Sequence, residues 1–288
     1  MKIAYFGGDM FFSCLKFLIE DGHEIIALYS YPPKQGEYDF AQNVVKQANL
    51  LHIPVKCHRP TEHDMRELSK QKCTMILSAG YPYKIPDWQD YNIRYAINIH
   101  PSLLPEGAGP LPLPMIILKD LKQSGLTLHE ISAKWDAGNI ILQEAFSLSG
   151  SENIEDLLIK NQEIALRLLK QFMQDPDRYW QNSTAQIRKE ENYWPMPADK
   201  SQFIIDYNME FETLSRTMLA HRYVNQAGEI ECISNISFWQ QDHSFETGTI
   251  ISQQDNFFQI AIKKGFIYFT LLVKPPIAPH LAQPNHKP

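Results

Sequence analysis

Short apolar runs alternate with amphipathic segments through the first hundred residues of the chain. The apolar runs, rich in branched and aromatic residues, cover residues 2–8, 23–31, 73–80 and 94–100. Such continuous runs are typical of strands that are buried on both faces of a parallel sheet. Helical patterns fill most of the intervening segments, at 10–21, within 41–52 and at 61–70, with a further short strand at 53–55. The alternation predicts an α/β domain with a Rossmann-like, mostly parallel sheet and helices on both faces.

The pattern after residue 112 predicts the edge of this sheet. A helix is expected at 113–124, followed by strands at 126–132 and 140–148 that are joined by a Gly-containing turn at 136–139. Two strands joined in this way indicate a hairpin. The polar run 151–153 is a typical helix cap, and the apolar residues after it recur at helical spacing. They are Ile154, Leu157, Leu158, Ala165, Leu168 and Phe172.

The pattern changes from about residue 175 onward. The stretch from about 175 to 200 is polar, aromatic and proline-bearing, as in a linker or lid. A short helix is expected near 209–218, and β patterns follow at 229–239, 248–253, 257–265 and 266–272. Strand runs separated by Gly, Asn and Asp predict a small β-rich, OB-like domain. We therefore expect a catalytic domain over 1–200 and a β-rich domain over 206–275.

Composition adds few constraints. The chain has 288 residues, of which 44% are hydrophobic and 21% charged, which is ordinary for a globular protein. It has no apolar run of the length that a membrane span needs and no signal-like start, so we expect a cytoplasmic protein. The four cysteines, Cys14, Cys57, Cys73 and Cys232, are widely spaced and are expected to be reduced.

Several familiar sites are missing from the sequence. Gly7 and Gly8 follow the first strand, but neither the GxGxxG nor the GxxxxGK[ST] spacing is present, which argues against NAD and ATP. Spacings typical of zinc sites and of serine hydrolases are absent as well, so no metal is expected. The net charge is −6 and no Lys/Arg cluster is present, which weighs against binding to nucleic acid through its phosphates.

The stretch INIHPSLLPEGAGPLPLP, residues 97–114, holds the clearest chemistry. Five prolines in this stretch exclude a long helix or a central strand beyond its first residues. Asn98 and His100 are two positions apart on the preceding strand, so both side chains point to the same face at its carboxyl end. Ligands of open α/β sheets bind beyond such ends. This arrangement would suit acyl transfer, in which an amide stabilises an oxyanion and an imidazole takes a proton. A carboxylate beside the imidazole would complete the site, and Asp136 is the best candidate for it.

Several stretches of the sequence, including this one, resemble a known protein family. The stretches NIHPSLLP at 98–105, SGLTLH at 124–129 and DAG at 136–138 resemble the folate-dependent formyltransferase family. That family includes methionyl-tRNA, glycinamide ribonucleotide and sugar N-formyltransferases. The opening strand-helix-strand and, more weakly, the C-terminal region resemble the family as well. The resemblance therefore covers most of the chain.

The resemblance implies a reaction and a site. Asn98, His100 and Asp136 fall on the catalytic trio of the family, whose cofactor is 10-formyltetrahydrofolate. The pterin of that cofactor lies against the backbone that follows the preceding strand and beside the aspartate turn. The implied cofactor residues here are Ser78, Gly80, Tyr81, Pro82, Tyr83 and Ile85, with Asp136.

Two departures bear on the acceptor. Many members have an Arg-Gly pair after the SLLP loop, where this chain has Glu106, Gly107, Ala108 and Gly109. The basic loop of the methionyl-tRNA enzymes is also missing from 31–42, and 206–288 holds six Lys/Arg against eight Asp/Glu. We therefore expect a small amine as acceptor, with a nucleotide-linked amino sugar favoured. Three alternatives to this function are compatible with the sequence: the methionyl-tRNA reaction, formylation of an amino-acid amine in peptide or siderophore assembly, and a non-catalytic binding protein. The sequence is also compatible with a homodimer.

Overall fold

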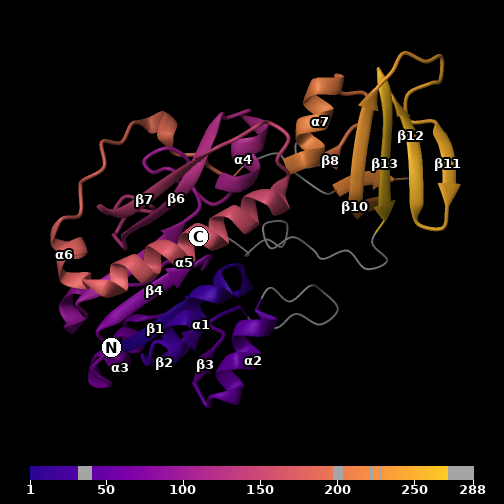
Figure 1. Ribbon diagram of the computed structural model, residues 1–288. Coiled ribbons are helices and arrows are strands. Elements are labelled where there is room, and N and C mark those ends of the chain that lie inside the picture. Colours follow the sequence, from indigo (N-terminus) through magenta and orange to yellow (C-terminus); the bar gives the residue numbers. More distant parts are fainter. Residues whose placement is uncertain (32–40, 197–203, 221–222, 227–228, 272–288) are drawn as a thin grey trace.

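The computed structural model describes residues 1–31, 41–196, 204–220, 223–226 and 229–271, which form two sheets with their own helices (Figure 1). The larger sheet has seven strands in the order β3-β2-β1-β4-β5-β6-β7. Its parallel strands are β1 (Lys2–Gly7), β2 (Glu24–Tyr29), β3 (Val55–Lys56), β4 (Met75–Ala79) and β5 (Tyr95–His100). The antiparallel hairpin of β6 (Gln123–Glu130) and β7 (Ile140–Ser147) completes one edge. The Rossmann-like, mostly parallel sheet and its edge hairpin are thus confirmed.

Helices cover both faces of the larger sheet. They are α1 (Phe12–Glu20), α2 (Gln42–Leu50), α3 (Glu62–Lys70), α4 (Pro112–Leu118), α5 (Ile154–Gln174) and α6 (Pro176–Gln181), with short 3₁₀ turns η1 (Asp9–Phe11), η2 (Gln89–Tyr91) and η3 (Glu190–Asn192). Alternate residues of β1 pack on opposite sides, because successive side chains of a strand point to opposite faces. Tyr5 lies in the core under α1, α2 and α5, and Phe6 lies in the core under α3.

Helix caps explain where two helices begin. Thr61 accepts a hydrogen bond from the Asp64 amide, and the Asp64 side chain accepts one from the Thr61 amide, so a capping box starts α3. The Asn153 and Asp156 pair does the same for α5. Both arrangements satisfy amide groups that have no partner inside the helix. The polar run 151–153 therefore marked the start of the long helix correctly.

The predicted helix at 113–124 was too long. The observed α4 ends at Leu118, Asp120 has a left-handed φ of 52°, and β6 already begins at Gln123, which pairs with Ser147 of β7. The apolar residues before 118 pack on α5, whereas the polar residues after it extend the hairpin. Pairing across the sheet, which the local sequence does not reveal, decided this boundary. The short strand likewise lies at Val55–Lys56, opposite Leu28 and Tyr29, rather than at 53–55.

The second sheet has six strands in the order β11-β12-β13-β10-β9-β8. Its elements are β8 (Ile204–Ile205), α7 (Phe211–Ala220), β9 (Tyr223–Gln226), β10 (Glu229–Gln240), β11 (Ile250–Gln254), β12 (Phe257–Ile262) and β13 (Gly265–Leu271). Leu214 and Met218 of α7 pack on Ile260, Ile267 and Phe269 in a separate core. The β-rich C-terminal region is confirmed, as an open sheet with β8 and β11 at its described edges. The C-terminal tail beyond 271 lies outside the described residues.

The two regions touch through α4 and α7. Ala220 packs with Leu113 and Ile116, and Arg216 forms an ion pair with Asp120 at 3.2 Å. Within the described ranges, no helix combines the length and apolar character that crossing a membrane requires.

Candidate active site

The strand β5 carries Asn98 and His100 to the carboxyl edge of the sheet. Asn98 lies between Ser78 of β4 and His129 of β6, and His100 lies opposite Thr127. His100 is 5% exposed. The two-residue spacing therefore places an amide and an imidazole next to each other where the parallel strands end, as the sequence predicted.

Asp136 reaches the same place from the turn between β6 and β7. Its backbone has a φ of 50°, a left-handed conformation that is uncommon for residues with a side chain. Oδ1 of Asp136 lies 3.5 Å from Nδ1 of His100 and 3.5 Å from Nδ2 of Asn98. Gln186, from beyond α6, donates hydrogen bonds to the carbonyls of Asp136 and Gly138 at 3.0 and 2.6 Å. The structure thus brings the three predicted residues together, and Gln186 holds the turn.

The imidazole of His100 has a defined orientation. Its Nε2 lies 2.8 Å from the carbonyl oxygen of Gly107, which can only accept, so Nε2 carries a proton and donates it. Burial lowers the pKa of His100 below its usual 6.5, against the opposite pull of Asp136. The neutral ring therefore keeps its basic lone pair on Nδ1, on the side of Asp136.

Asp136 is a buried carboxylate. Burial alone would raise its pKa, but the imidazoles of His100 and His129 and the hydrogen bond from the Gly109 amide outweigh burial and hold the pKa well below its usual value. The Gly109 amide donates to Oδ2 of Asp136 at 2.9 Å. A fixed negative charge beside Nδ1 of His100 would stabilise the ring once it takes up a proton.

His129 is a fourth member of this cluster that the sequence did not single out. Its Nδ1 donates to the carbonyl of Glu130 at 2.8 Å, so its Nε2 accepts a hydrogen bond from Nδ2 of Asn98 at 3.0 Å. With a neutral His129 ring, the nitrogen of the Asn98 amide, rather than its oxygen, faces His129. His129 is 2% exposed, and its Nε2 lies 3.6 Å from Oδ1 of Asp136. The sequence placed His129 on the predicted strand 126–132, but it did not show that His129 pairs with Asn98 across the sheet.

The proline loop after β5 is fastened to the sheet. Thr127 Oγ1 donates to the Ser102 carbonyl at 2.7 Å and accepts from the Leu104 amide at 3.2 Å. Gln143 of β7 donates to the Leu104 carbonyl at 2.9 Å. These bonds hold residues 102–104 on the hairpin, so the loop is part of the wall of the site.

The glycine half of the loop is fastened to residues 192–194. The Ala108 amide donates to the Asn192 carbonyl at 3.1 Å, and the Trp194 amide donates to the Ala108 carbonyl at 2.7 Å. Gly109 has a φ of 126°, and a Cβ there would stand 2.2 Å from the Trp194 carbonyl oxygen. Only glycine allows this approach, which in turn aims the Gly109 amide at Asp136.

The segment after β4, where the cofactor residues were expected, lies beside Asn98. Tyr81 and Ile85 are 7% exposed and their side chains pack in the core under α3, so these two residues can offer a ligand mainly their backbone. Among the described residues, the amides of Tyr81, Tyr83 and Ile85 have no hydrogen-bond acceptor in the chain. Free amides at this edge fit a polar heterocycle such as a pterin. The assignment of Ser78, Gly80, Tyr81, Pro82, Tyr83 and Ile85 to the cofactor remains a prediction.

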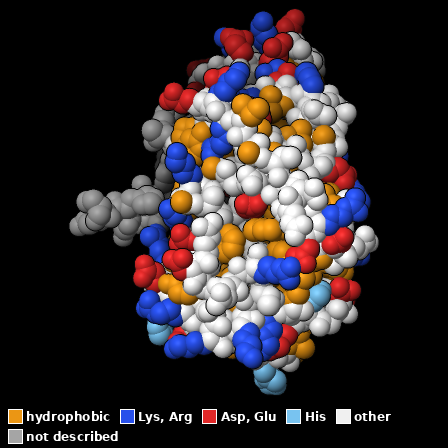
Figure 2. Space-filling model, turned by 90° about the vertical axis from the view of Figure 1, so that its left-hand side faces the viewer, with side chains coloured by type: hydrophobic (Ala, Val, Ile, Leu, Met, Phe, Trp, Pro, Cys, Tyr) orange, Lys and Arg blue, Asp and Glu red, His pale blue; other side chains and the backbone are white. Residues whose placement is uncertain are grey.

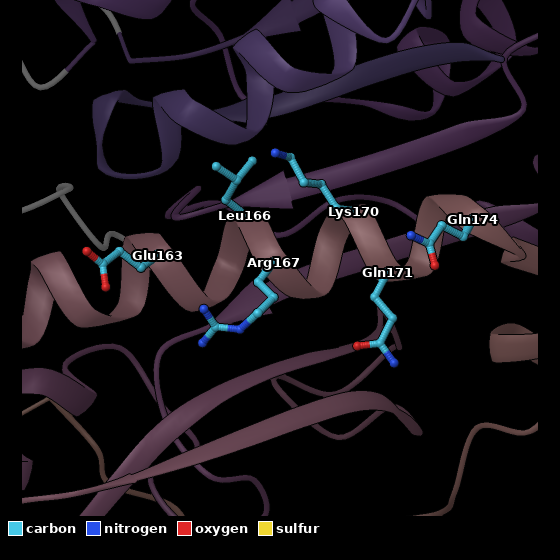
Figure 3. A pocket seen from close by; sticks show the side chains of 6 residues that line it. All are labelled: Glu163, Leu166, Arg167, Lys170, Gln171 and Gln174. Carbon is cyan, nitrogen blue, oxygen red and sulfur yellow. The ribbon is translucent and has the colours of Figure 1, made fainter.

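Two surface features lie apart from these residues. A depression of about 510 Å³ follows the outer face of α5 and is lined by Glu163, Leu166, Arg167, Lys170, Gln171 and Gln174 (Figure 3). All six belong to one helix and none is a site residue. The face seen from the left of Figure 1 shows Lys and Arg interspersed with Asp and Glu rather than gathered in one basic area (Figure 2).

Comparison with known proteins identifies related chains. The family model described as Formyl transferase matches residues 1–172. A methionyl-tRNA formyltransferase of Anaplasma marginale is 28% identical over 227 residues, which cover 76% of this chain and 74% of that protein. A methionyl-tRNA formyltransferase of Alkaliphilus oremlandii is 31% identical over 164 residues, which cover 54% of this chain and 53% of that protein.

Solved structures share the fold. WlaRD, a sugar 3N-formyl transferase crystallised with dTDP and 5-N-formyl-THF, matches with a TM-score of 0.65 and 19% identity over 95% of this chain and 98% of its own. The N-formyltransferase of Helicobacter canadensis, in complex with folinic acid and dTDP-3-aminofucose, matches with a TM-score of 0.67 and 18% identity over 94% of this chain and 100% of its own. HypX of Aquifex aeolicus, with tetrahydrofolic acid, matches with a TM-score of 0.64 and 18% identity over 93% of this chain and 43% of its own.

Proposed function

This chain belongs to the formyl transferase family, and we propose that it is an N-formyltransferase that moves the formyl group of 10-formyltetrahydrofolate to a primary amine. The cluster of Asn98, His100 and Asp136 at the carboxyl edge of β5 is the observation that carries the proposal. It supplies an amide donor, a basic imidazole nitrogen and a buried carboxylate within about hydrogen-bonding reach of one another. The folate, when bound, supplies an activated formyl carbon and a nitrogen leaving group.

Each residue has a distinct part in this proposal. Asn98 has one amide hydrogen engaged with His129 and the other directed at Oδ1 of Asp136 over a long 3.5 Å, and this second hydrogen is the one that would turn to the formyl oxygen and stabilise its developing negative charge. His100 takes the proton of the attacking amine at Nδ1, because its Nε2 already donates to Gly107, and passes that proton on to the folate nitrogen as it leaves. Asp136 stabilises the protonated ring and holds it in place through the turn that Gln186 fastens.

We propose that the acceptor is a small amine, with a nucleotide-linked amino sugar favoured. The net charge is −6, and the face in Figure 2 carries mixed charges rather than the broad basic surface that RNA binding favours. The similar solved structures that span nearly the whole chain include a sugar 3N-formyl transferase and an enzyme bound to a dTDP-amino sugar. These likenesses support the proposal and concern the fold alone.

The proposal is tested by incubating the purified chain with 10-formyltetrahydrofolate and a panel of nucleotide-linked amino sugars. Mass spectrometry of the acceptors and release of tetrahydrofolate would report transfer. We expect a formylated product with at least one member of the panel and none with the Asn98→Ala variant. If no amine in a panel that also includes free amino acids and amino sugars is formylated, the proposed function is wrong.

Methionyl-tRNA is the second candidate acceptor, because the similar curated relatives act on it by name. A filter-binding assay with charged initiator tRNA distinguishes this acceptor from a small amine. Binding that weakens steeply with added salt, together with formylation of the methionyl group, would favour this reaction over the small-amine acceptor.

A further inference from the structure

Arg188 is an arginine close to the catalytic cluster whose charge has no acidic partner within the described residues. One guanidinium nitrogen, NH1, donates a hydrogen bond to the carbonyl of Trp135 at 3.1 Å. A guanidinium has five N–H donors, so most of its donors remain available. The positive charge of Arg188 also helps to lower the pKa of His100, after the larger effect of burial, which places the guanidinium within electrostatic reach of the imidazole.

The segment that carries Arg188 is held in place. Ile140 and Thr184 exchange two backbone hydrogen bonds at 2.8 and 2.9 Å, and Gln186 grips the aspartate turn two residues before Arg188. The turn itself is tight, because a Cβ at Gly138 would stand 2.0 Å from the Glu130 carbonyl oxygen. Arg188 is therefore presented from a fixed strand-like segment rather than from a free loop.

Trp135, whose backbone carbonyl accepts the hydrogen bond from Arg188, has a side chain that is unusually exposed for its size. It is the residue before Asp136, and 49% of its surface is accessible. Trp offers a large planar face for stacking, and a guanidinium next to it offers a fork of donors that matches carboxylate and phosphate oxygens. An exposed aromatic side chain directly before Asp136, and an arginine held at its backbone carbonyl with no acidic partner among the described residues, fit one kind of ligand: a planar ring close to an oxyanion.

We propose that Arg188 and Trp135 form a subsite for the ring-bearing, anionic end of a substrate whose reacting group lies at Asn98, His100 and Asp136. The inference rests on the proposed function, which accounts for the reacting end of the substrate. It adds the residues that would bind the opposite end of the same substrate. Two substrates of the proposed reaction have this chemistry: a nucleotide-linked acceptor, with its base and phosphates, and the folate, with its benzoyl ring and carboxylates. Residues 106–109, on the opposite wall, contribute no cation, and Glu106 is bound by Asn192 at 2.7 Å.

Calorimetry with three probes, dTDP, 5-formyltetrahydrofolate and inorganic pyrophosphate, tests the proposal without requiring turnover. The variants are Arg188→Gln, Arg188→Lys and Trp135→Ala. Lys189→Gln is the matched control, because Lys189 is a neighbouring exposed cation that pairs with Glu191 at 3.7 Å. We expect Arg188→Gln and Trp135→Ala each to weaken binding of the same organic probe about tenfold or more, with partial recovery in Arg188→Lys and no change in Lys189→Gln. Melting temperatures like that of the wild type would show that the variants are folded.

The probe whose binding is weakened in the variants identifies the substrate that carries the anionic group. Loss confined to dTDP and pyrophosphate assigns the subsite to the acceptor, and loss confined to 5-formyltetrahydrofolate assigns it to the folate. The proposal is overturned if folded Arg188→Gln and Trp135→Ala bind every probe as the wild type does, or if the wild type binds none of them. Formyl transfer is assayed separately, so binding without transfer to any amine would reject the proposed function and leave this subsite standing.

Discussion

Nδ2 of Asn98 donates a hydrogen bond to Nε2 of His129 over 3.0 Å, between directly paired positions of β5 and β6. When the ring of His129 is neutral, its Nδ1 donates to the Glu130 carbonyl and its Nε2 is left as an acceptor. The pair therefore sets the orientation of the Asn98 amide, whose second hydrogen is directed toward Oδ1 of Asp136 over 3.5 Å. An amide that rotated by half a turn would present an oxygen there instead.

We expect His129→Leu to lower kcat about tenfold or more, because the Asn98 amide loses the acceptor that orients it. KM for the formyl donor should change little, and His129→Gln, whose side-chain oxygen can still accept, should recover part of the rate. Steady-state kinetics would measure both, with His63→Gln on the surface of α3 as the control. An unchanged kcat in a folded His129→Leu variant would show that Asn98 needs no such partner.

Removing the side chain of Asn98, His100 or Asp136 should each slow formyl transfer on the order of 10²–10³-fold. The reason differs in each case: loss of the oxyanion donor, of the proton acceptor, and of the charge that stabilises the protonated imidazole. Single-turnover rates of the three alanine variants would be compared with that of Asn182→Ala, an exposed amide that ends α6. Near-native rates in all three variants would refute the assignment.

The activity of the wild type should fall on the acidic side, because His100 accepts a proton only when it is neutral. Burial lowers the pKa of His100 below 6.5, so the fall should begin below that pH. A profile of kcat against pH would measure this limb. A rate that rises as His100 becomes protonated would contradict its role as a base.

The same shift predicts a change in stability. Between pH 6.5 and the lower pKa of the folded state, the unfolded chain binds more protons at His100 than the folded chain, so stability falls as the pH decreases through this window. His100→Gln should lose this part of the pH dependence. Melting temperatures at about pH 7.5 and 5.5 would show a smaller difference in His100→Gln than in the wild type or in His63→Gln.

Gly109→Ala should destabilise the protein by about 3 kcal/mol or more and should also reduce activity. The added Cβ would meet the Trp194 carbonyl at 2.2 Å in addition to the strain of a φ of 126°. Gly22→Ala provides the comparison, because Gly22 has a φ of 81° and open space around its would-be Cβ, so it should cost only about 1 kcal/mol. Equal losses of unfolding free energy in the two variants would mean that the contact with Trp194 is not a constraint.

Much of the larger sheet could be predicted because its strands are buried on both faces. Ile76 and Leu77 of β4, for example, are wholly buried on opposite sides, so the strand reads as one apolar run. The two-residue spacing of Asn98 and His100 likewise needs only strand geometry. The end of α4 was missed because the pairing of Gln123 with Ser147, more than twenty residues away, decides it.

The remaining site residues depend on contacts that no local pattern contains. His129 enters the cluster through the register of β6, and Gln186 contacts the aspartate turn from a segment that returns from beyond α6. The 1–200 and 206–275 division remains a prediction, since residues 197–203 lie outside the described ranges.

The backbone bonds between Ala108 and residues 192–194 join parts of the chain that the family model divides. Asn98, His100 and Asp136 lie within the matched residues 1–172, whereas Gln186, Asn192 and Trp194, which hold the aspartate turn and the loop facing it, lie beyond them. A chain cut at residue 172 would keep Asn98, His100 and Asp136 and lose the contacts that hold the aspartate turn and the loop whose Gly109 amide donates to Asp136. The geometry of the proposed catalytic residues therefore depends on a stretch of the chain that lies beyond the matched one.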